Sequence, residues 1–160
     1  TMSILKVDTL QPATASSVHI AGHVIQYQQR YFDTSGFTAS TASYIDYTNA
    51  YVDITPKFSN SLIKFRTQVI GKNATSLGYS QFQIVDTNNS NTRFNPNTAA
   101  ESAFYQGTDW NTAVITAINT ANTTSTMRLQ LRVLTSSGST SDFNWSNGDS
   151  RHVEAWEIAQ

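Results

Sequence analysis

The sequence predicts an all-β fold, either a β-sandwich or a jelly roll. Uncharged polar residues dominate the chain of 160 residues, which holds 22 Thr, 19 Ser and 13 Asn. Thr favours strands, whereas Ser and Asn favour turns. Apolar side chains recur at every second position in several segments, and turn residues separate these segments at short intervals. At this length one domain is expected, since domains usually span about 100–200 residues.

The longest clean alternation in the first half of the chain ends at Gly71 and predicts a central strand. Pro56 has a fixed φ and no N–H, so it ends the short strand before it. After a turn over residues 59–61, apolar or small side chains alternate with polar ones: Ile63, Phe65, Thr67 and Val69 against Lys64, Arg66 and Gln68. A period of two with one apolar face indicates a half-buried strand of an antiparallel sheet.

The same reasoning predicts further strands along the chain. They are His23 to Phe32, Tyr44 to Tyr47, Tyr51 to Ile54, Gly78 to Val85, Asn111 to Ile118, Met127 to Val133 and His152 to Ala159. Thr48-Asn49-Ala50 is expected to be a tight turn. The long strand ending at Gly71 is expected to form a hairpin with the strand that begins at Gly78.

The remaining segments are predicted to be turns and loops. Asp86 to Ala100 is Asn-rich and is expected to be a long surface loop. One helical turn is expected over Ala99 to Tyr105. Asn147-Gly148 is typical of a type I′ turn, because both central positions of that turn need a positive φ.

Residues 1–22 are expected to form an N-terminal segment ahead of a domain of residues 23–160. Pro12, a small polar run over residues 13–17 and Ala21-Gly22 interrupt every apolar run in that segment. Thr1 precedes Met2-Ser3, which resembles a natural start, so we expect the natural chain to begin at Met2.

Charge and composition exclude several classes of partner. The net charge is −1 and only 13% of residues are charged, so no basic field exists to attract nucleic acid or an anionic membrane. No run approaches the roughly 20 apolar residues of a membrane span, so no membrane insertion is expected. The absence of cysteine excludes disulfides and thiolate metal sites.

No catalytic constellation, metal site or cofactor site is expected, so the sequence predicts a non-enzyme. The carboxylates that could form an acid–base pair stand in no motif: Asp86, Asp109, Asp142, Asp149, Glu101, Glu154 and Glu157. His19 and His23 lie four residues apart but lack a third ligand. The oxygen-rich stretch Asp86 to Asn91 holds one carboxylate, too few for a typical calcium loop.

Aromatic side chains are the best candidates for a binding surface. One group lies in or beside predicted loops and could either stack on a sugar ring or plug the ends of the fold: Tyr105, Trp110, Phe143 and Trp145. In the sugar-binding alternative, the Asp109 carboxylate would accept hydrogen bonds from the sugar hydroxyls. A second group is larger than one sandwich easily hides, and could line either a subunit interface or the edge of the core: Tyr27, Tyr31, Tyr44, Tyr47 and Tyr51.

Three stretches carry a resemblance to a known family. The chain opens with S-I-L-K-V-D-T-L-Q and V-H-I-A-G-H-V-I-Q (Ser3 to Gln11 and Val18 to Gln26), passes through V-D-I-T-P-K-F-S-N-S-L-I-K-F (Val52 to Phe65) and closes with H-V-E-A-W-E-I-A-Q. In this order they resemble the opening, middle and closing segments of small virion fibre proteins of tailed bacteriophages, especially marine and cyanobacterial phages.

This resemblance implies a jelly-roll β-sandwich of tumour-necrosis-factor-like or C1q-like form, assembled as a homotrimer on the virion. It implies a structural or receptor-binding role in host attachment and brings no catalytic residues. The N-terminal segment, Ser3 to Gln26, would contact other virion proteins or form the trimer. The loops Phe104 to Trp110 and Asp142 to Gly148 would contact a host surface glycan or protein.

The chain departs from long fibres in having no shaft, no coiled-coil heptads and no collagen-like repeat. It also lacks the H-x-H pair that some phage spike tips use to bind an axial metal ion, and these absences leave its position on the tail or the head open. A capsid decoration protein or head fibre is therefore an alternative, and a monomeric carbohydrate-binding module is an alternative of another class.

Overall fold

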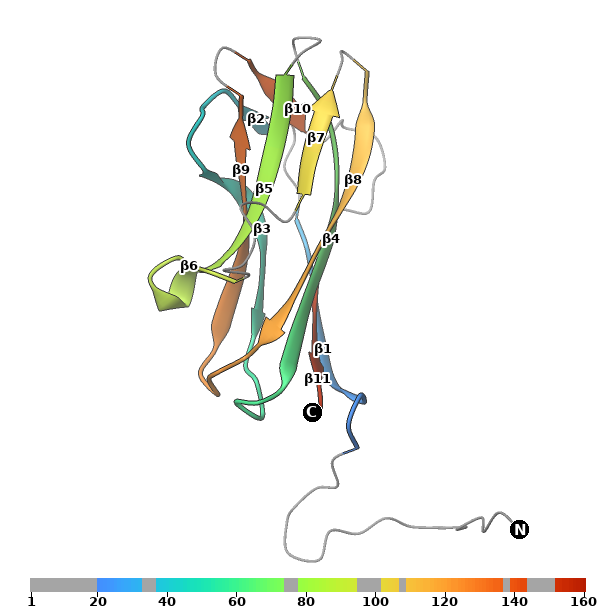
Figure 1. The fold of residues 1–160 in the computed structure, drawn as a ribbon, viewed down its shortest axis with the longest axis vertical. Coiled ribbons are helices and arrows are strands. Elements are labelled where there is room, and N and C mark those ends of the chain that lie inside the picture. The colour runs from blue at the N-terminus through green and yellow to red at the C-terminus, as the bar shows by residue number, and fades with distance from the viewer. Residues whose placement is uncertain are drawn as a thin grey trace, which may run out of the picture.

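The computed structural model confirms the all-β class. It describes residues 20–32, 37–73, 78–94, 109–136, 139–143 and 152–160, together with the backbone of residues 102–106. Two curled antiparallel sheets lie face to face with the hydrophobic core between them (Figure 1). We call them sheet A and sheet B.

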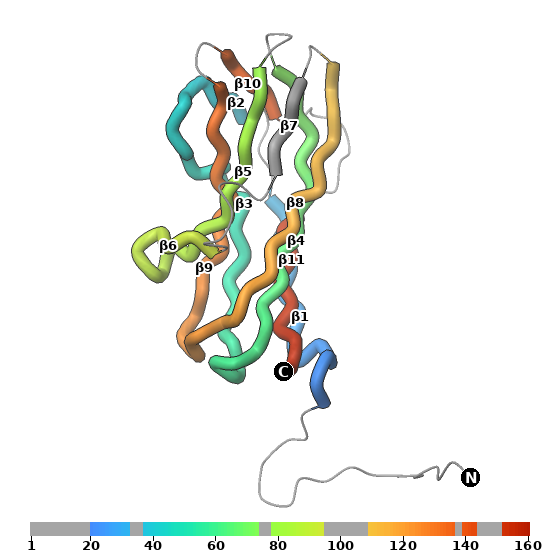
Figure 2. The backbone as a smooth tube through the Cα atoms, in the orientation of Figure 1, coloured from blue at the N-terminus to red at the C-terminus, as the bar shows by residue number. Residues whose placement is uncertain are grey.

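Sheet A has six strands in the described chain. They are β1 (Val24–Tyr31), β2 (Phe37–Ala39), β4 (Leu62–Asn73), β8 (Asn111–Thr120), β10 (Ser141–Phe143) and β11 (His152–Ile158). Their order is β1-β11-β4-β10-β2, with β8 on the other edge of β4. β1 and β11 run side by side toward the end where the described chain begins and ends (Figure 2).

Sheet B has five strands in the described chain. They are β3 (Ile45–Ile54), β5 (Gly78–Asp86), β6 (Thr92–Arg93), β7 (Ser102–Gln106) and β9 (Met127–Thr135). Their order is β3-β9-β5-β6, and β7 also pairs with β5. A single 3₁₀ turn, η1 (Thr87–Asn89), follows β5.

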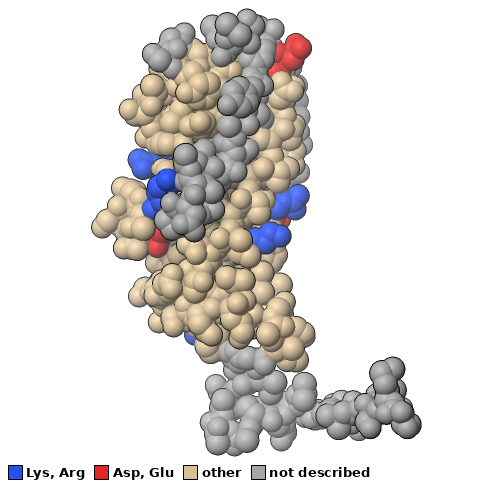
Figure 3. All heavy atoms as spheres, viewed as in Figure 1, with Lys and Arg blue, Asp and Glu red and all other residues tan. Residues whose placement is uncertain are grey.

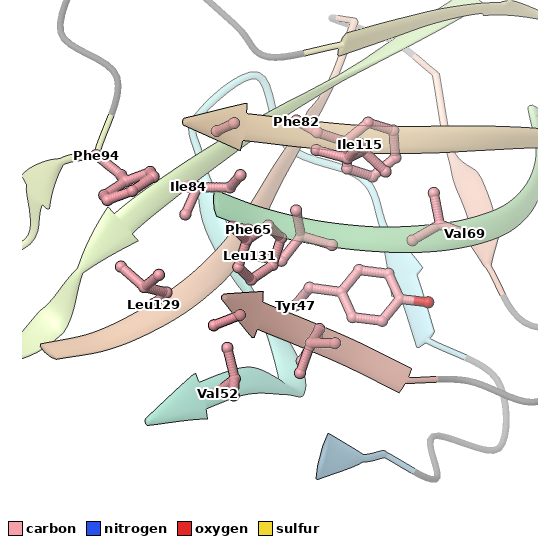
Figure 4. Close-up of a cluster of buried hydrophobic side chains, with 14 of the residues drawn as sticks. Tyr47, Val52, Phe65, Val69, Phe82, Ile84, Phe94, Ile115, Leu129 and Leu131 are labelled. Atoms are coloured by element: carbon pink, nitrogen blue, oxygen red, sulfur yellow. The ribbon is translucent and has the colours of Figure 1, made fainter. Parts of the chain in front are cut away.

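The central strand predicted from the alternation up to Gly71 is confirmed as β4. It pairs with β8 along one edge and with β11 and β10 along the other. Its alternate residues Ile63, Phe65, Thr67 and Val69 are buried. They meet side chains from sheet B such as Leu131, as the labelled residues of the core show (Figure 4).

The predicted hairpin between this strand and the strand from Gly78 is wrong. β4 belongs to sheet A and β5 to sheet B, so the chain crosses from one sheet to the other after Asn73. Alternation shows that a strand has one buried face, but both sheets of a sandwich bury one face. The pattern therefore could not assign the two strands to their sheets.

The predicted tight turn at Thr48-Asn49-Ala50 is also wrong. The segment is a bulge inside the continuous strand β3, whose pairing with β9 is interrupted between Asp46 and Tyr51. Asn49 has a φ of 61°, a left-handed conformation that Asn adopts more readily than most residues. Gln130 donates from Nε2 to the carbonyls of Tyr47 and Ala50, at 2.8 and 3.2 Å, so two carbonyls that the bulge removes from the ladder are satisfied.

Short strands account for the other differences. The helical turn expected over Ala99 to Tyr105 is wrong where it can be compared, because Ser102–Gln106 is the strand β7. β2, β6 and β10 lie in segments predicted as loops, and each has only two or three residues. The Asn147-Gly148 turn and residues 1–19 of the N-terminal segment lie outside the described residues.

A buried carboxylate joins the two sheets at the end of β11. Glu157 is fully buried and accepts from the Gln26 side chain at 2.6 Å, from the Lys57 N–H at 2.9 Å and from the Phe58 N–H at 3.1 Å. Gln26 also donates to the Thr55 carbonyl at 2.6 Å. Burial alone would raise the pKa of Glu157, but these hydrogen bonds to the charged form together lower it below its ordinary value.

Candidate interaction surface

Exposed apolar side chains gather on one sheet. Among the described residues, the large apolar side chains that are exposed lie on or beside β1 and on β8: Ile20, Val24, Tyr27, Tyr31, Val114 and Ile118. Both strands belong to sheet A. Large apolar side chains that are exposed on one sheet mark it as a candidate interaction surface.

Strand register aligns these side chains across the sheet. In one row, Tyr27 faces Trp156, Trp156 faces Lys64, and Lys64 faces Ile118. Side chains directly opposite one another on an antiparallel sheet share a face. We call the solvent side of β1, β11, β4 and β8 the outer face of sheet A.

A polar row crosses the same face. Glu154 faces Gln29 on one side and Arg66 on the other, and Arg66 faces Thr116. Tyr31, whose side chain is 69% exposed, faces His152. The outer face of sheet A thus mixes large aromatic and aliphatic side chains with Lys64, Glu154, Arg66 and His152.

The aromatic part of this face is ordered by contacts within the chain. The rings of Tyr27 and Trp156 lie 5.4 Å apart at 44°, and the Lys64 ammonium lies 5.5 Å from the Trp156 ring. The Tyr27 hydroxyl donates to Glu154 at 3.0 Å, and His152 Nε2 lies 3.0 Å from the same carboxylate. Desolvation and this hydrogen bond raise the pKa of Tyr27, so its hydroxyl remains a donor at neutral pH.

Between residues 114 and 118, β8 carries apolar side chains on both of its faces. Ile115 and Ala117 point into the core and are buried, while Val114 and Ile118 point outward and are about half exposed. Strands of this composition are typical of sheets that are covered on both sides. On β8 the outward apolar side chains Val114 and Ile118 are thus about half exposed and not fully covered by the described part of the chain.

The outer side of sheet B has a different chemistry. Arg128 donates to both carboxylate oxygens of Asp53, at 2.8 and 2.9 Å. The guanidinium groups of Arg128 and Arg30 lie 4.3 and 3.6 Å from the centre of the Tyr51 ring. Most of the surface in view is uncharged, and the Lys and Arg side chains lie mainly in two separate groups at mid-height, one toward each side of the view (Figure 3).

The five tyrosines proposed for a subunit interface separate into three groups. Tyr27 and Tyr31 lie on the outer face of sheet A and are exposed. Tyr51 and Tyr44 are half-buried, and the Tyr51 ring contacts Arg128 of sheet B and Arg30 of β1 in sheet A. The expectation that Tyr47 lies at an interface is wrong for this chain, because its side chain is fully buried in the core beside Phe37.

The five residues proposed for receptor contact differ in exposure. The expectation that Phe143 contacts a receptor is wrong, because its ring is buried against Tyr47, with ring centroids 5.6 Å apart. The same ring lies so close to Gly71 that a Cβ at that position would collide with it. Asp109 is exposed, and Trp110 is half-buried with the Lys72 ammonium 5.1 Å from its ring.

The other two receptor candidates cannot be placed in full. Tyr105 lies in β7, where the structure describes the backbone alone. Trp145 lies outside the described residues. Asn111, which follows Trp110, pairs with Gly71 on the opposite edge from Phe143, so Trp110 and the end of β10 share one end of sheet A.

Two of the candidate carboxylates hold hydrogen bonds within the fold. Asp86 accepts from the Asn88 and Arg128 N–H groups, and Asp142 accepts from Thr38. His23 is exposed, whereas His19, Glu101 and Asp149 lie outside the described residues. In the described chain, no three or more His, Cys, Asp or Glu residues group closely enough to hold a metal ion. No helix among these residues is long and apolar enough to cross a membrane.

The chain matches no protein-family model, and no curated protein is significantly similar to it. Its function is therefore inferred from its own residues and geometry. The sequence had indicated Tyr27 and Tyr31 but not Val114, Ile118 or Trp156. The signal for β8 was available, because apolar residues occupy both alternation positions between residues 113 and 118.

Proposed function

We propose that this chain is a non-enzymatic virion structural protein of a tailed bacteriophage, of the tail-fibre or receptor-binding type. In this proposal it assembles as a homotrimer and mediates attachment to the host surface. The subunits meet through the outer face of sheet A. The N-terminal segment, as the resemblance implies, contacts other virion proteins.

The observation that carries the assembly is the concentration of exposed apolar side chains on sheet A. A monomer gains nothing from exposing Tyr31, Val114 and Ile118 on one face, because burying apolar surface stabilises by about 25 cal/mol per Å². A second copy removes that surface from water. Tyr27 and Trp156 suit such an interface, because each combines a large apolar area with a polar group.

The strand order supports the jelly-roll part of the proposal. The longer strands form two four-stranded sets, β1-β11-β4-β8 and β3-β9-β5-β7. Successive strands β3, β4 and β5 change sheets each time. Two antiparallel sheets joined by such crossovers are typical of jelly rolls.

The mass in solution tests the assembly directly. Light scattering after size-exclusion chromatography should give three times the chain mass of 17.7 kDa. A clean monomer at micromolar concentration would exclude the trimer and favour the monomeric carbohydrate-binding module.

Localisation on the particle tests the virion role separately. Mass spectrometry of purified tails and of heads lacking tails should find the protein with the tails. Recovery with the heads would favour a capsid decoration protein or head fibre. Absence from complete particles would contradict every virion role.

A further inference from the structure

A polar hollow lies between the β5–β6 turn and the connection from β8 to β9, with a volume of about 340 Å³. The β5–β6 turn and η1 project from the body of the sandwich beside it (Figure 1). This volume is within the range of roughly 300–1,000 Å³ that small-molecule sites occupy. A single sugar ring fits a space of this size.

Strand register places a carboxylate in this hollow. Asp86 lines it and pairs with Thr92 on β6 and with Leu129 on β9. Leu129 is buried in the core, and cross-strand partners share a face of the sheet, so the Asp86 side chain lies on the core-facing side of sheet B. Phe94 and Met127 also line the hollow and belong to the core. The hollow therefore combines a carboxylate with apolar side chains.

No described cationic group neutralises this carboxylate within the hollow. Arg93 is the one basic residue of the lining, but it pairs with Val85, and Val85 lies on the opposite face of β5 from its neighbour Asp86. The Arg128 guanidinium binds Asp53, which is not part of the lining. Among the described residues the hollow thus carries a negative charge, which disfavours an acidic ligand.

One oxygen of the carboxylate has no protein partner. Asp86 is 6% exposed, and its Oδ1 accepts from the Asn88 N–H at 3.1 Å and from the Arg128 N–H at 3.0 Å. Within the described chain Oδ2 accepts no hydrogen bond, yet it is not fully enclosed. A largely buried acceptor is costly to leave without a donor. The Oδ2 atom is therefore suited to a donor on a ligand, such as a hydroxyl.

The rest of the lining is dense in amides and hydroxyls. Four Asn and five Thr or Ser residues contribute to it: Asn88, Asn89, Asn119, Asn122, Thr92, Thr120, Thr123, Thr126 and Ser125. Amides and hydroxyls both donate and accept hydrogen bonds. Sugar hydroxyls do the same, so this lining fits a polyhydroxylated ligand better than an apolar one.

Two hydrogen bonds hold the walls of the hollow together. The Asn88 side chain donates to the Thr126 carbonyl at 3.0 Å, and the Asn119 side chain donates to the Phe94 carbonyl at 2.6 Å. Each bond links the β5–β6 side to the β8–β9 side. The hollow is therefore preformed, which lowers the ordering cost of binding.

We propose that this hollow binds an uncharged sugar, as a single pyranose unit. The Asp86 Oδ2 atom accepts from a sugar hydroxyl, and the exposed side chains of Asn89 and Asn122, on opposite walls, bind other hydroxyls. A metal ion is disfavoured, because Asp86 is the single carboxylate of the lining and calcium sites need several oxygen ligands.

This site goes beyond the proposed function and is distinct from the loop aromatics considered for receptor contact. It depends on neither self-association nor a place on a virion. It can therefore fail or succeed independently of the proposed function, and light scattering of the samples used for binding reports assembly separately.

NMR titration of the ¹⁵N-labelled full chain tests the proposal with defined probes. The probes are D-glucose, D-galactose and D-mannose, with D-glucuronate, D-galacturonate and D-mannuronate as acidic counterparts. At least one neutral sugar should shift the amide signals of residues 86–94 and 119–127. Its dissociation constant should be about tenfold or more below that of its acidic counterpart, because the Asp86 carboxylate repels a second carboxylate.

Variants identify the groups responsible. Asp86→Asn keeps an oxygen for the Asn88 and Arg128 N–H groups but removes the charge and the second acceptor, so it should weaken the neutral sugar about tenfold. Asp53→Asn makes the same charge change outside the hollow and should leave binding unchanged. Asn89→Ala removes an exposed amide of one wall without touching the hydrogen bonds of Asp86, and should weaken the sugar about threefold or more.

Any of four results would overturn the proposal. The first is the absence of shifts in the hollow with every neutral sugar up to about 100 mM. The second is binding that neither Asp86→Asn nor Asn89→Ala weakens. The third is an acidic sugar that binds as tightly as its neutral counterpart. The fourth is a response of the same amides to calcium chloride but not to the sugars, which would assign the hollow to a cation.

Discussion

The two sheets present opposite chemistry to solvent, although both are built from the same alternating strands. On sheet A, Tyr31, Val114 and Ile118 stand exposed. On sheet B, the corresponding side carries the bidentate pair of Arg128 with Asp53, and no large apolar side chain of its described residues is exposed.

The difference is whether the outward side chains of a sheet find their partners within one chain or leave apolar area exposed to water. On sheet B, Arg128 and Asp53 are paired with each other within the chain and remain partly exposed to water. On sheet A, Tyr31, Val114 and Ile118 leave about half or more of their surface exposed. An interface between copies is therefore expected on sheet A, and the predictions below test that contrast.

The largest effect is expected from a charge placed on the outer face of sheet A. Ile118→Glu should convert the assembly to monomers, because each subunit would bury a carboxylate in the interface, and desolvating a charge costs several kcal/mol even where Lys64 faces it. Light scattering over a dilution series measures the change in mass. The fold should persist, because the Ile118 side chain is 49% exposed within one chain.

Thr48→Glu is the matched control on sheet B. Thr48 is exposed on β3, so the same added charge should leave the mass unchanged. If both variants dissociate the assembly, or neither does, the contrast between the two outer faces does not govern self-association.

The contrast also requires that β11 keep its register, because a slip of one residue would exchange its two faces. Glu157→Gln tests the side chain that fixes its end. Loss of the charged acceptor for Gln26 and the Lys57 and Phe58 N–H groups should cost about 2–4 kcal/mol of unfolding free energy. Urea unfolding measures it.

Glu154→Gln is the paired control, three residues away on the other face of β11. Glu154 accepts from the Tyr27 hydroxyl, an exposed contact, so its loss should cost about 1 kcal/mol or less. Equal losses in the two variants would contradict the role assigned to Glu157.

The pH dependence of the unfolding free energy gives a second test of the stabilisation by Glu157. Its pKa is lower in the folded chain than the ordinary 4.5, so the unfolded chain binds the proton more readily. The stabilisation is therefore complete above pH 4.5 and is lost as the pH falls through the folded pKa. Wild type should lose more stability than Glu157→Gln between pH 7 and about pH 3.

Much of the fold could be predicted because alternation reports burial directly. The strands β4 and β9 follow from alternation whose apolar sets are the buried sets, and β8 follows from its content of Thr, Val and Ile, although its apolar residues lie on both faces. Which sheet each strand joins was not predictable from these patterns, because every sandwich strand buries one face. β2 and β10 escaped detection, since three residues contain too little alternation to distinguish a strand from a loop.

The sites were less predictable, for a related reason. An aromatic ring in a sequence carries no sign of its direction, so Phe143 and Tyr47 could equally have pointed outward, and both are buried. A polar hollow of about 340 Å³ is lined by two segments about 30 residues apart, residues 86–94 and 119–127. Their approach follows from sheet pairing, which no local pattern encodes.

An intermediate effect is expected on sheet B, at the bulge of β3. Gln130→Ala should cost about 1–3 kcal/mol, because its side chain donates to the carbonyls of Tyr47, Ala50 and Leu131 in a buried position. Urea unfolding measures the loss. Gln81→Ala, a half-buried glutamine on β5 of the same sheet, should cost much less. Comparable losses would show that the bulge carbonyls do not depend on Gln130.

The smallest effect is expected at the partly exposed pair of Arg128 and Asp53 on sheet B. Arg128→Ala removes the contacts with Asp53 and Tyr51, which are partly exposed, and should cost about 0.5–1 kcal/mol. The hydrogen bond to Asp53 raises the pKa of Arg128, so the pair is charged throughout the usual pH range and the loss should shrink at about 1 M salt.

Arg128→Lys completes this test, because it keeps the charge but cannot form the two parallel hydrogen bonds to Asp53. It should recover part of the stability lost in Arg128→Ala. Neither variant should alter the mass by light scattering, since the Arg128 side chain is satisfied within one chain. A monomer from either one would place part of the subunit interface on sheet B, and would restrict the outer face of sheet A to a share of it.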